Sequence, residues 1–195
     1  MKPFRPSIQG RKIRFALAGC GRIAKNHFES IAKLSDQCEL VDVCDTDATA
    51  LQAAVAATGA KGHSDLGQML ASSQADCVVL TTPSGLHPRQ AIEAARAGFD
   101  VMTEKPMSTR WSEGLEMVRA CDEAGARLFV VKQNRRNPTL QLLKKAVASG
   151  RFGRIYMVNV NVFWTRPQSY YDSAAWRGTW EFDGGAFMNQ ASHYV

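Results

Sequence analysis

The chain has 195 residues, of which 45% are hydrophobic and 22% charged, as in an ordinary globular protein with a core of its own. No apolar run approaches the roughly 20 residues of a membrane helix, and the N-terminus lacks the apolar stretch of a secretory signal. The net charge is +6, but five of the 24 basic residues lie among the first 14, which hold no acid. The rest of the chain is nearly neutral, which argues against nucleic-acid binding and against a membrane partner.

Five cysteines are scattered along the chain, with no CxxC or metal-ligand spacing among them. Cys38, Cys44 and Cys77 lie in apolar runs, where a free thiol acts as a small hydrophobic group. An odd number of scattered thiols is typical of a reducing compartment. We therefore expect a cytoplasmic protein without a metal site.

In chain order, apolar runs alternate with helix-periodic segments up to residue 134. We predict strands at 12–20, 38–45, 76–82, 100–105 and 127–134, and helices at 21–34, 47–59, 65–72, 87–98 and 109–124. Nearly continuous apolar strands that alternate with helices predict a parallel sheet covered on both faces. The expected fold class is α/β, a doubly wound Rossmann sheet over residues 12–134 that follows a basic leader, residues 1–11.

The pattern changes after residue 134. A helix is predicted at 138–150, and the period-two alternation of 155–166 predicts a long strand with one buried face. Another helix is expected to start near Ala186. One strand and the opening of a helix do not close a sheet. Residues 135–195 are therefore interpreted as the beginning of an α+β substrate and oligomerisation domain that is incomplete.

The stretch GCGRIA, residues 19–24, follows the first predicted strand and opens the first helix. This G-x-G-x-x-A spacing is typical of a dinucleotide site, because Gly19 allows the tight turn and Gly21 lets a pyrophosphate approach the backbone. Ala24 permits close packing of the helix on the strand, and the helix N-terminus favours an anion. A methyl-donor domain also uses a Gly-rich first loop, but nothing later in the chain favours it.

Asp45 ends the second predicted strand and is the candidate acceptor for both ribose hydroxyls of NAD. A carboxylate there repels the 2′-phosphate of NADP, so NAD is the expected cofactor. The alternative is that Asp45 only caps the next helix. Asp42 is a competing carboxylate, but its alternation with Val41 and Val43 turns it away from the binding edge.

Histidines give weaker signals. Thr82, Pro83 and Ser84 form a polar turn where a strand ends, and His87 begins the next helix, either near a ligand or packed as a structural residue. His27 and His63 have no evident partner in the sequence and are interpreted as structural or surface residues.

Glu104-Lys105-Pro106 follows a strand directly, at the edge where a doubly wound sheet binds its ligand. A partly desolvated lysine beside a nicotinamide can pass a proton at neutral pH. Pro106 fixes the backbone after Lys105, through a cis bond if the turn requires one. From position alone, a catalytic Lys105 and an ordinary strand end remain equal alternatives.

His193 is the second acid–base candidate. Asn189 precedes it by four residues, so both side chains would project from one face of a continuous helix. A single histidine at helical spacing is more often structural, and this alternative stays open.

Taken together, GCGRIA, Asp45, TTPSGLH at 81–87, EKP at 104–106 and DGGAFMNQASH at 183–193 resemble the Gfo/Idh/MocA oxidoreductases. These are NAD(P)-dependent enzymes that act mostly on sugars, cyclitols and nucleotide sugars. The resemblance implies that Lys105 is catalytic or orients the substrate and that His193 is the general base. Many members have Asp where this chain has Asn189, so we expect Asn189 to hydrogen-bond the substrate.

The resemblance also implies two sets of binding residues. For the cofactor these are Gly19, Gly21, Arg22, Ile23, Asp45, Thr82, Pro83, His87, Glu104, Lys105, Gln133, Trp176 and Arg177. For the substrate they are Lys105, Arg135, Asn137, Asn189 and His193.

The stretches VVKQNRRNP at 130–138, RPQSYYD and AWRGTW resemble members from cell-surface polysaccharide pathways. Some of those oxidise the 3-hydroxyl of UDP-N-acetylglucosaminuronate, so a nucleotide sugar or sugar acid is the expected substrate, ahead of a plain sugar or cyclitol. Arg135 and Arg136 would then pair with a carboxylate or phosphate, unless they are solvated surface charges. Family members are considerably longer, and a homo-oligomer is expected for a full-length form. The alternative function is a truncated or non-catalytic NAD-binding protein.

Overall fold

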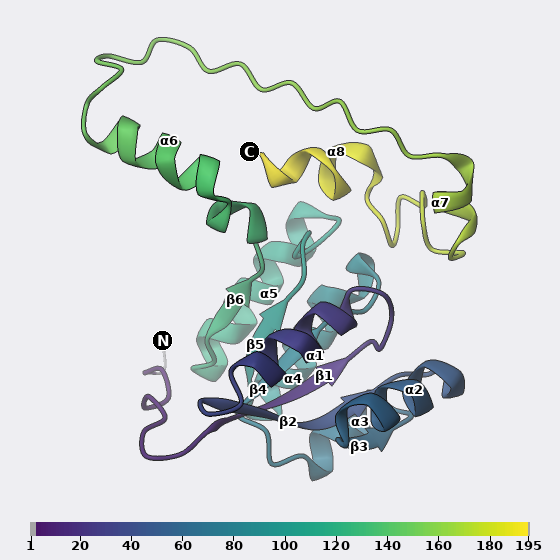
Figure 1. The fold of residues 1–195 in the computed structure, drawn as a ribbon. Helices are drawn as coiled ribbons and strands as arrows, with labels where there is room; N and C mark the ends of the chain where they lie inside the picture. The colour runs from purple at the N-terminus through teal and green to yellow at the C-terminus, as the bar shows by residue number, and fades with distance from the viewer. Residues whose placement is uncertain (1–2, 195) are drawn as a thin grey trace.

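The computed structural model describes residues 3–194 (Figure 1). Its centre is a sheet of six strands in the order β3-β2-β1-β4-β5-β6, with every pairing parallel. The strands are β1 (Ile13–Ala18), β2 (Cys38–Cys44), β3 (Lys61–His63), β4 (Cys77–Leu80), β5 (Asp100–Thr103) and β6 (Leu128–Val130). The predicted Rossmann sheet is confirmed. Strand β3 is not among the predicted strands, because Lys-Gly-His carries no strand signal.

Helices connect the strands and cover the sheet. They are α1 (Ala24–Lys33), α2 (Ala48–Thr58), α3 (Leu66–Ser72), α4 (His87–Arg96) and α5 (Trp111–Ala124). Asp47 caps α2 by accepting a hydrogen bond from the Ala50 N–H, and Gly59 ends that helix in the left-handed region. Within residues 3–194, every helix falls short of the length and apolar character that a membrane crossing requires.

The core lies on both faces of the sheet because successive strand residues point to opposite sides. Ala16 and Val78 face a cluster with side chains of α3, α4 and α5, while Leu17 and Val79 pack on the side of α1. All five cysteines are buried and unpaired by disulfides. Because every strand pairing is parallel, the carboxyl ends of the strands lie at one edge of the sheet. This edge carries the loops after β1, β2, β4 and β5.

The C-terminal part differs from its prediction. After α6 (Pro138–Ala148), residues 155–166 run as an extended arm, drawn in light green at the top of Figure 1, and form no strand. The predicted strand is wrong, because alternation describes only the side chains and a strand also needs a backbone partner, which this arm lacks within residues 3–194. Phe163 is 89% exposed and Met157 is 83% exposed.

The chain then returns to the carboxyl edge of the sheet through two short helices, α7 (Gln168–Asp172) and α8 (Gly185–Asn189). The helix predicted to start near Ala186 is confirmed by α8, but its continuation to His193 is wrong. Helix α8 ends at Asn189, and His193 lies in a separate 3₁₀ turn, Ala191–His193.

Candidate active site

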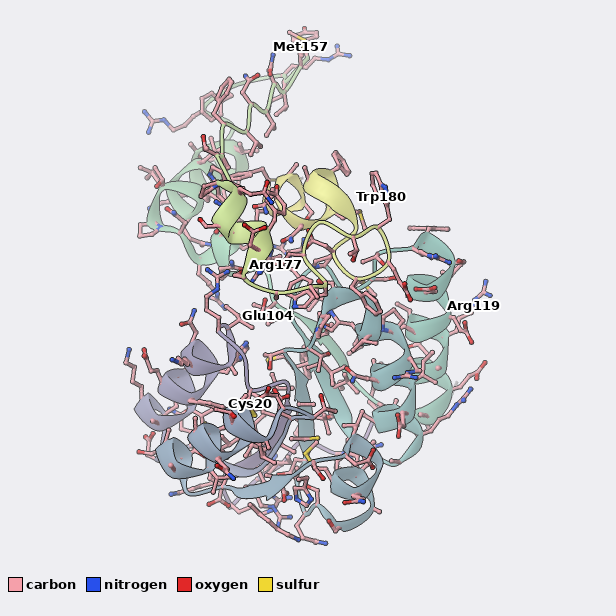
Figure 2. The ribbon with its side chains drawn as sticks, turned by 90° about the vertical axis from the view of Figure 1, so that its right-hand side faces the viewer. Cys20, Glu104, Arg119, Met157, Arg177 and Trp180 are labelled. Carbon is pink, nitrogen blue, oxygen red and sulfur yellow. The ribbon has the colours of Figure 1, made fainter. Side chains whose placement is uncertain are left out.

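A cavity of about 960 Å³ opens at the carboxyl edge of the sheet, between the strand ends and the returning C-terminal segment. Every residue of the predicted cofactor set lines it, and so do Asn189 and His193 of the predicted substrate set. Arg177 of the C-terminal segment and Glu104 of the sheet edge both line it, whereas Figure 2 shows Met157 at the far tip of the arm. The cavity is therefore built from both parts of the chain.

The glycine loop forms one wall. Gly19 has φ of +94°, and its N–H donates to the Cys44 carbonyl at 2.8 Å. No protein atom among the described residues lies within 4 Å of a Cβ built on Gly21, so this position is open toward the cavity. Helix α1 begins after Ile23 without a side-chain cap, which leaves backbone N–H groups available to an anion.

Asp45 stands at the end of β2 and braces this loop. One of its carboxylate oxygens accepts from the Cys20 N–H at 2.6 Å and the other accepts from the Asp47 N–H at 2.8 Å. The cap of α2 is Asp47 and not Asp45. A carboxylate has about four acceptor sites, so Asp45 retains capacity for two hydroxyl groups. Asp42 is engaged elsewhere: it is buried and accepts from His63 and Ser73.

His87 is almost fully buried and bridges two loops. Its ring nitrogens lie 2.9 Å from the Pro106 carbonyl and 3.0 Å from the Thr82 carbonyl. Burial lowers the pKa of His87 below the ordinary histidine value, although the two carbonyls oppose this. These contacts fit a structural residue that connects the turn after β4 to the loop after β5, where the peptide bond between Lys105 and Pro106 is cis.

Glu104 is held from two sides. His27 of α1 contacts one carboxylate oxygen at 2.9 Å, and the Lys105 N–H donates to the other at 3.2 Å. Burial alone would raise the pKa of Glu104, but the His27 contact and the Lys105 charge together bring that pKa below its ordinary value. A charged Glu104 therefore lies beside Lys105, and His27 has a partner that the sequence did not reveal.

The Lys105 side chain points to the C-terminal segment. Its Nζ donates to the backbone carbonyl of Asn189 at 2.8 Å and to its side-chain Oδ1 at 3.1 Å. Burial lowers the pKa of Lys105, and the charges of Lys132 and Arg166 add to this effect. Such a lysine exchanges a proton more readily near neutral pH than a solvated one.

His193 lines the same cavity. Its Nδ1 is buried and, within residues 3–194, has no hydrogen-bond partner. Burial and then the charge of Lys105 lower the pKa of His193. The imidazole is therefore neutral at pH 7 and able to accept a proton.

Two arginines also line the cavity. Arg177 belongs to the predicted cofactor set, whereas Arg166 belongs to neither predicted set. The Arg166 guanidinium lies over Trp164 and Tyr170, and the Arg177 guanidinium lies 4.4 Å from the Tyr170 ring centroid. Neither has an acidic partner within 4.0 Å among the described residues, and the Nε of each is buried without a partner there. Two such cations favour an anionic ligand.

Arg135 and Asn137 lie outside this cavity. Arg135 is exposed in the 3₁₀ turn after β6, and Asn137 caps α6 by accepting from the Thr139 N–H at 3.0 Å. Gln133 of the same turn does line the cavity. Substrate contacts of Arg135 and Asn137 stay a prediction.

The fold and its cavity define a protein of the dinucleotide-binding class. The chain belongs to the Gfo/Idh/MocA family: residues 13–132 match the model described as "Oxidoreductase family, NAD-binding Rossmann fold". Residues 140–195 match the GFO/IDH/MocA C-terminal domain. The resemblance drawn from the motifs is thus confirmed.

Solved structures provide similar proteins. The WlbA dehydrogenase of Chromobacterium violaceum, in complex with NADH and UDP-GlcNAcA, is 71% identical with a TM-score of 0.95, over 97% of this chain and 55% of that one. WlbA of Bordetella pertussis, with the same two molecules, is 70% identical with a TM-score of 0.94, over 96% and 56%. An inositol 2-dehydrogenase of Rhizobium meliloti is 32% identical over 76% of this chain and 44% of its own. The chain thus spans about half the length of these relatives.

The residues at the cavity fit NAD. The volume lies within the range of cofactor sites, about 300–1,000 Å³. Gly21 leaves room for a pyrophosphate, the uncapped start of α1 supplies donors, and Asp45 has free acceptor sites. On this basis the glycine loop and Asp45 would hold the dinucleotide.

Proposed function

We propose that this protein is an NAD-dependent dehydrogenase that oxidises a secondary hydroxyl of a nucleotide-linked sugar acid such as UDP-GlcNAcA. The observation that carries the proposal is the convergence of Lys105, His193 and the glycine loop on one cavity. The two WlbA structures, both in complex with NADH and UDP-GlcNAcA, support this substrate class. Arg166 and Arg177 supply positive charge for the anionic groups of such a molecule. A homo-oligomer and a cytoplasmic location remain predictions.

In the proposed mechanism, a bound NAD supplies the hydride acceptor. The residues of this chain hold the sugar hydroxyl and remove its proton. His193, neutral because burial and Lys105 lower its pKa, takes that proton from the hydroxyl oxygen as hydride leaves the carbon that bears the hydroxyl. The Lys105 ammonium donates a hydrogen bond to the hydroxyl oxygen and stabilises the negative charge that develops there.

The proposed function is tested by mixing the purified chain with NAD and UDP-GlcNAcA and following the appearance of NADH. UDP-N-acetylglucosamine, which lacks the carboxylate, is the matched control substrate, and myo-inositol represents the cyclitol alternative. We expect turnover of the acid only. Turnover of myo-inositol with none of UDP-GlcNAcA would contradict the substrate class, and NADH binding without any turnover would favour the non-catalytic alternative.

Asp45 is proposed to select NAD over NADP. We expect Asp45→Asn to weaken NADH binding by about tenfold or more, because charge-assisted hydrogen bonds contribute about 1.5–3 kcal/mol each. NADPH binding should weaken less, because the repulsion of its 2′-phosphate is removed. Fluorescence titrations with both cofactors measure the ratio. Asp47→Asn is the matched control, since it removes the same charge two residues away and keeps a good helix cap. An unchanged NADH-to-NADPH ratio in Asp45→Asn would disprove the selectivity role.

A further inference from the structure

A buried carboxylate stands behind the lysine contact. Asp183 is 3% exposed, and its two oxygens accept hydrogen bonds from the Gly178 N–H at 3.0 Å and from the Nδ2 of Asn189. The Oδ1 of the same Asn189 amide accepts from Lys105 Nζ. Asp183, Asn189 and Lys105 thus form a continuous row of hydrogen bonds that ends in the cavity.

The two ends of the row fix which way the amide points. A carboxylate only accepts hydrogen bonds and an ammonium only donates them. The Asn189 NH₂ must therefore face Asp183, and its oxygen must face Lys105. A neutral partner at 183, able to donate as well as accept, would leave the amide free to turn over.

The negative charge of Asp183 has no local neutralising partner. Within residues 3–194, no lysine, arginine or histidine nitrogen lies within 4.0 Å of it. Burying such a charge is costly. The two N–H groups face different oxygens of Asp183, and a neutral amide would present an acceptor at only one of these two positions. The carboxylate therefore holds the Asn189 NH₂ in place as an acceptor, and its charge also acts on the Lys105 ammonium.

The loop that carries Asp183 is docked on the nucleotide-binding part. The Gly85 N–H donates to the Phe182 carbonyl at 3.1 Å, and the Thr109 hydroxyl donates to the Glu181 carbonyl at 3.0 Å. A Cβ built on Gly85 would lie only 2.1 Å from the Glu181 oxygen, so the two backbones are in direct contact. Asp183 is therefore held at a fixed place relative to β5 and Lys105.

We propose that Asp183 is a positioning residue that orients the Asn189 amide and thereby fixes the place and charge state of the Lys105 ammonium. This inference rests on the proposed function of Lys105 and adds a residue to it. Through the Asn189 amide, the Asp183 carboxylate influences the Lys105 ammonium without contacting it directly. The charged or titratable groups that face Lys105 are Glu104, Lys132, Arg166, Asp183 and His193.

The test exchanges the two side chains. Asp183→Asn removes the charge, Asn189→Asp places two carboxylates together, and the double variant D183N/N189D restores one carboxylate and one amide in reversed order. In the double variant, residue 183 accepts from the Gly178 N–H and donates to residue 189, which accepts from Lys105. The proposal expects both single variants to lose turnover by about tenfold or more and the double variant to recover most of it.

A second readout needs neither substrate nor turnover. The labelling rate of Lys105 by an amine-reactive reagent, measured by mass spectrometry across pH, reports where its ammonium loses a proton. Because the Asp183 charge opposes the lowering of the Lys105 pKa, Asp183→Asn should shift this profile to lower pH, and the double variant should shift it back. Asp172→Asn, an exposed carboxylate of α7, is the matched control and should leave the profile unchanged.

The outcomes separate this inference from the proposed function. If the wild-type chain shows no turnover, the labelling profiles still decide the inference. A profile in Asp183→Asn identical to wild type, in a variant with normal thermal unfolding, would overturn it. So would a double variant that is no better than the worse single variant, because a merely structural Asp183 predicts additive losses.

Discussion

Lys105→Met is expected to lower kcat by about 10²- to 10³-fold, the range for loss of a donor that stabilises the negative charge developing on the reacting oxygen. Methionine keeps the unbranched stem and removes only the ammonium that contacts Asn189. Because the glycine loop and Asp45 would hold the dinucleotide, NADH affinity should change by less than about tenfold. Turnover and fluorescence titration on the same preparation measure the two effects. Lys144→Met, an exposed lysine of α6, is the matched control and should behave as wild type.

Lys105→Arg distinguishes charge from proton exchange at the same position. Arginine stays protonated at every working pH, so it preserves a positive charge but cannot pass a proton.

The acid limb of the wild-type pH profile is expected to belong to His193, because this base is active only when neutral. Its pKa is lowered, so the limb should lie below the ordinary histidine value and should disappear in His193→Ala. Full activity in Lys105→Met would remove Lys105 from the mechanism.

The parts of the site that share one sheet edge were predictable from the sequence. Gly19, Asp45 and Lys105 each follow a strand, and parallel strands bring their carboxyl ends to the same edge. The position of a residue directly after a predicted strand is then sufficient to place it in the site, because the parallel topology brings these strand ends together. The same reasoning predicted a Rossmann fold, which the structure confirms.

Contacts between distant segments could not be predicted in this way. His27 of α1 contacts Glu104, the residue after β5, although the two lie 77 positions apart and no local pattern indicates the contact. The Asn189 amide donates to Asp183 across the short helix α8, which ends at Asn189 where the sequence suggested a continuous helix. Arg166 lies in a segment whose alternation predicted a strand, but alternation cannot supply the missing backbone partner.

The glycine loop gives the other large expected effect. A Cβ at Gly19 would lie 2.6 Å from the Thr82 nitrogen and 2.7 Å from the Thr81 carbonyl carbon, and φ there is +94°. Backbone atoms of a central strand end cannot move aside cheaply. Gly19→Ala is therefore expected to lower the free energy of unfolding by about 2–5 kcal/mol, which combines left-handed strain with overpacking. Denaturant unfolding measures the change.

Two other glycines separate the causes. Gly59→Ala carries a comparable positive φ of +71° but meets no atom within 4 Å, so it should show the backbone strain alone. Gly21→Ala has neither strain nor a protein contact, so stability should stay near wild type while NADH affinity falls, because the new methyl group occupies the space left for the pyrophosphate. If Gly21→Ala bound NADH normally, the loop would not approach the cofactor as the cavity indicates. A stable Gly19→Ala would instead mean that the ends of β1 and β4 are not in the close contact on which the position of the whole loop depends.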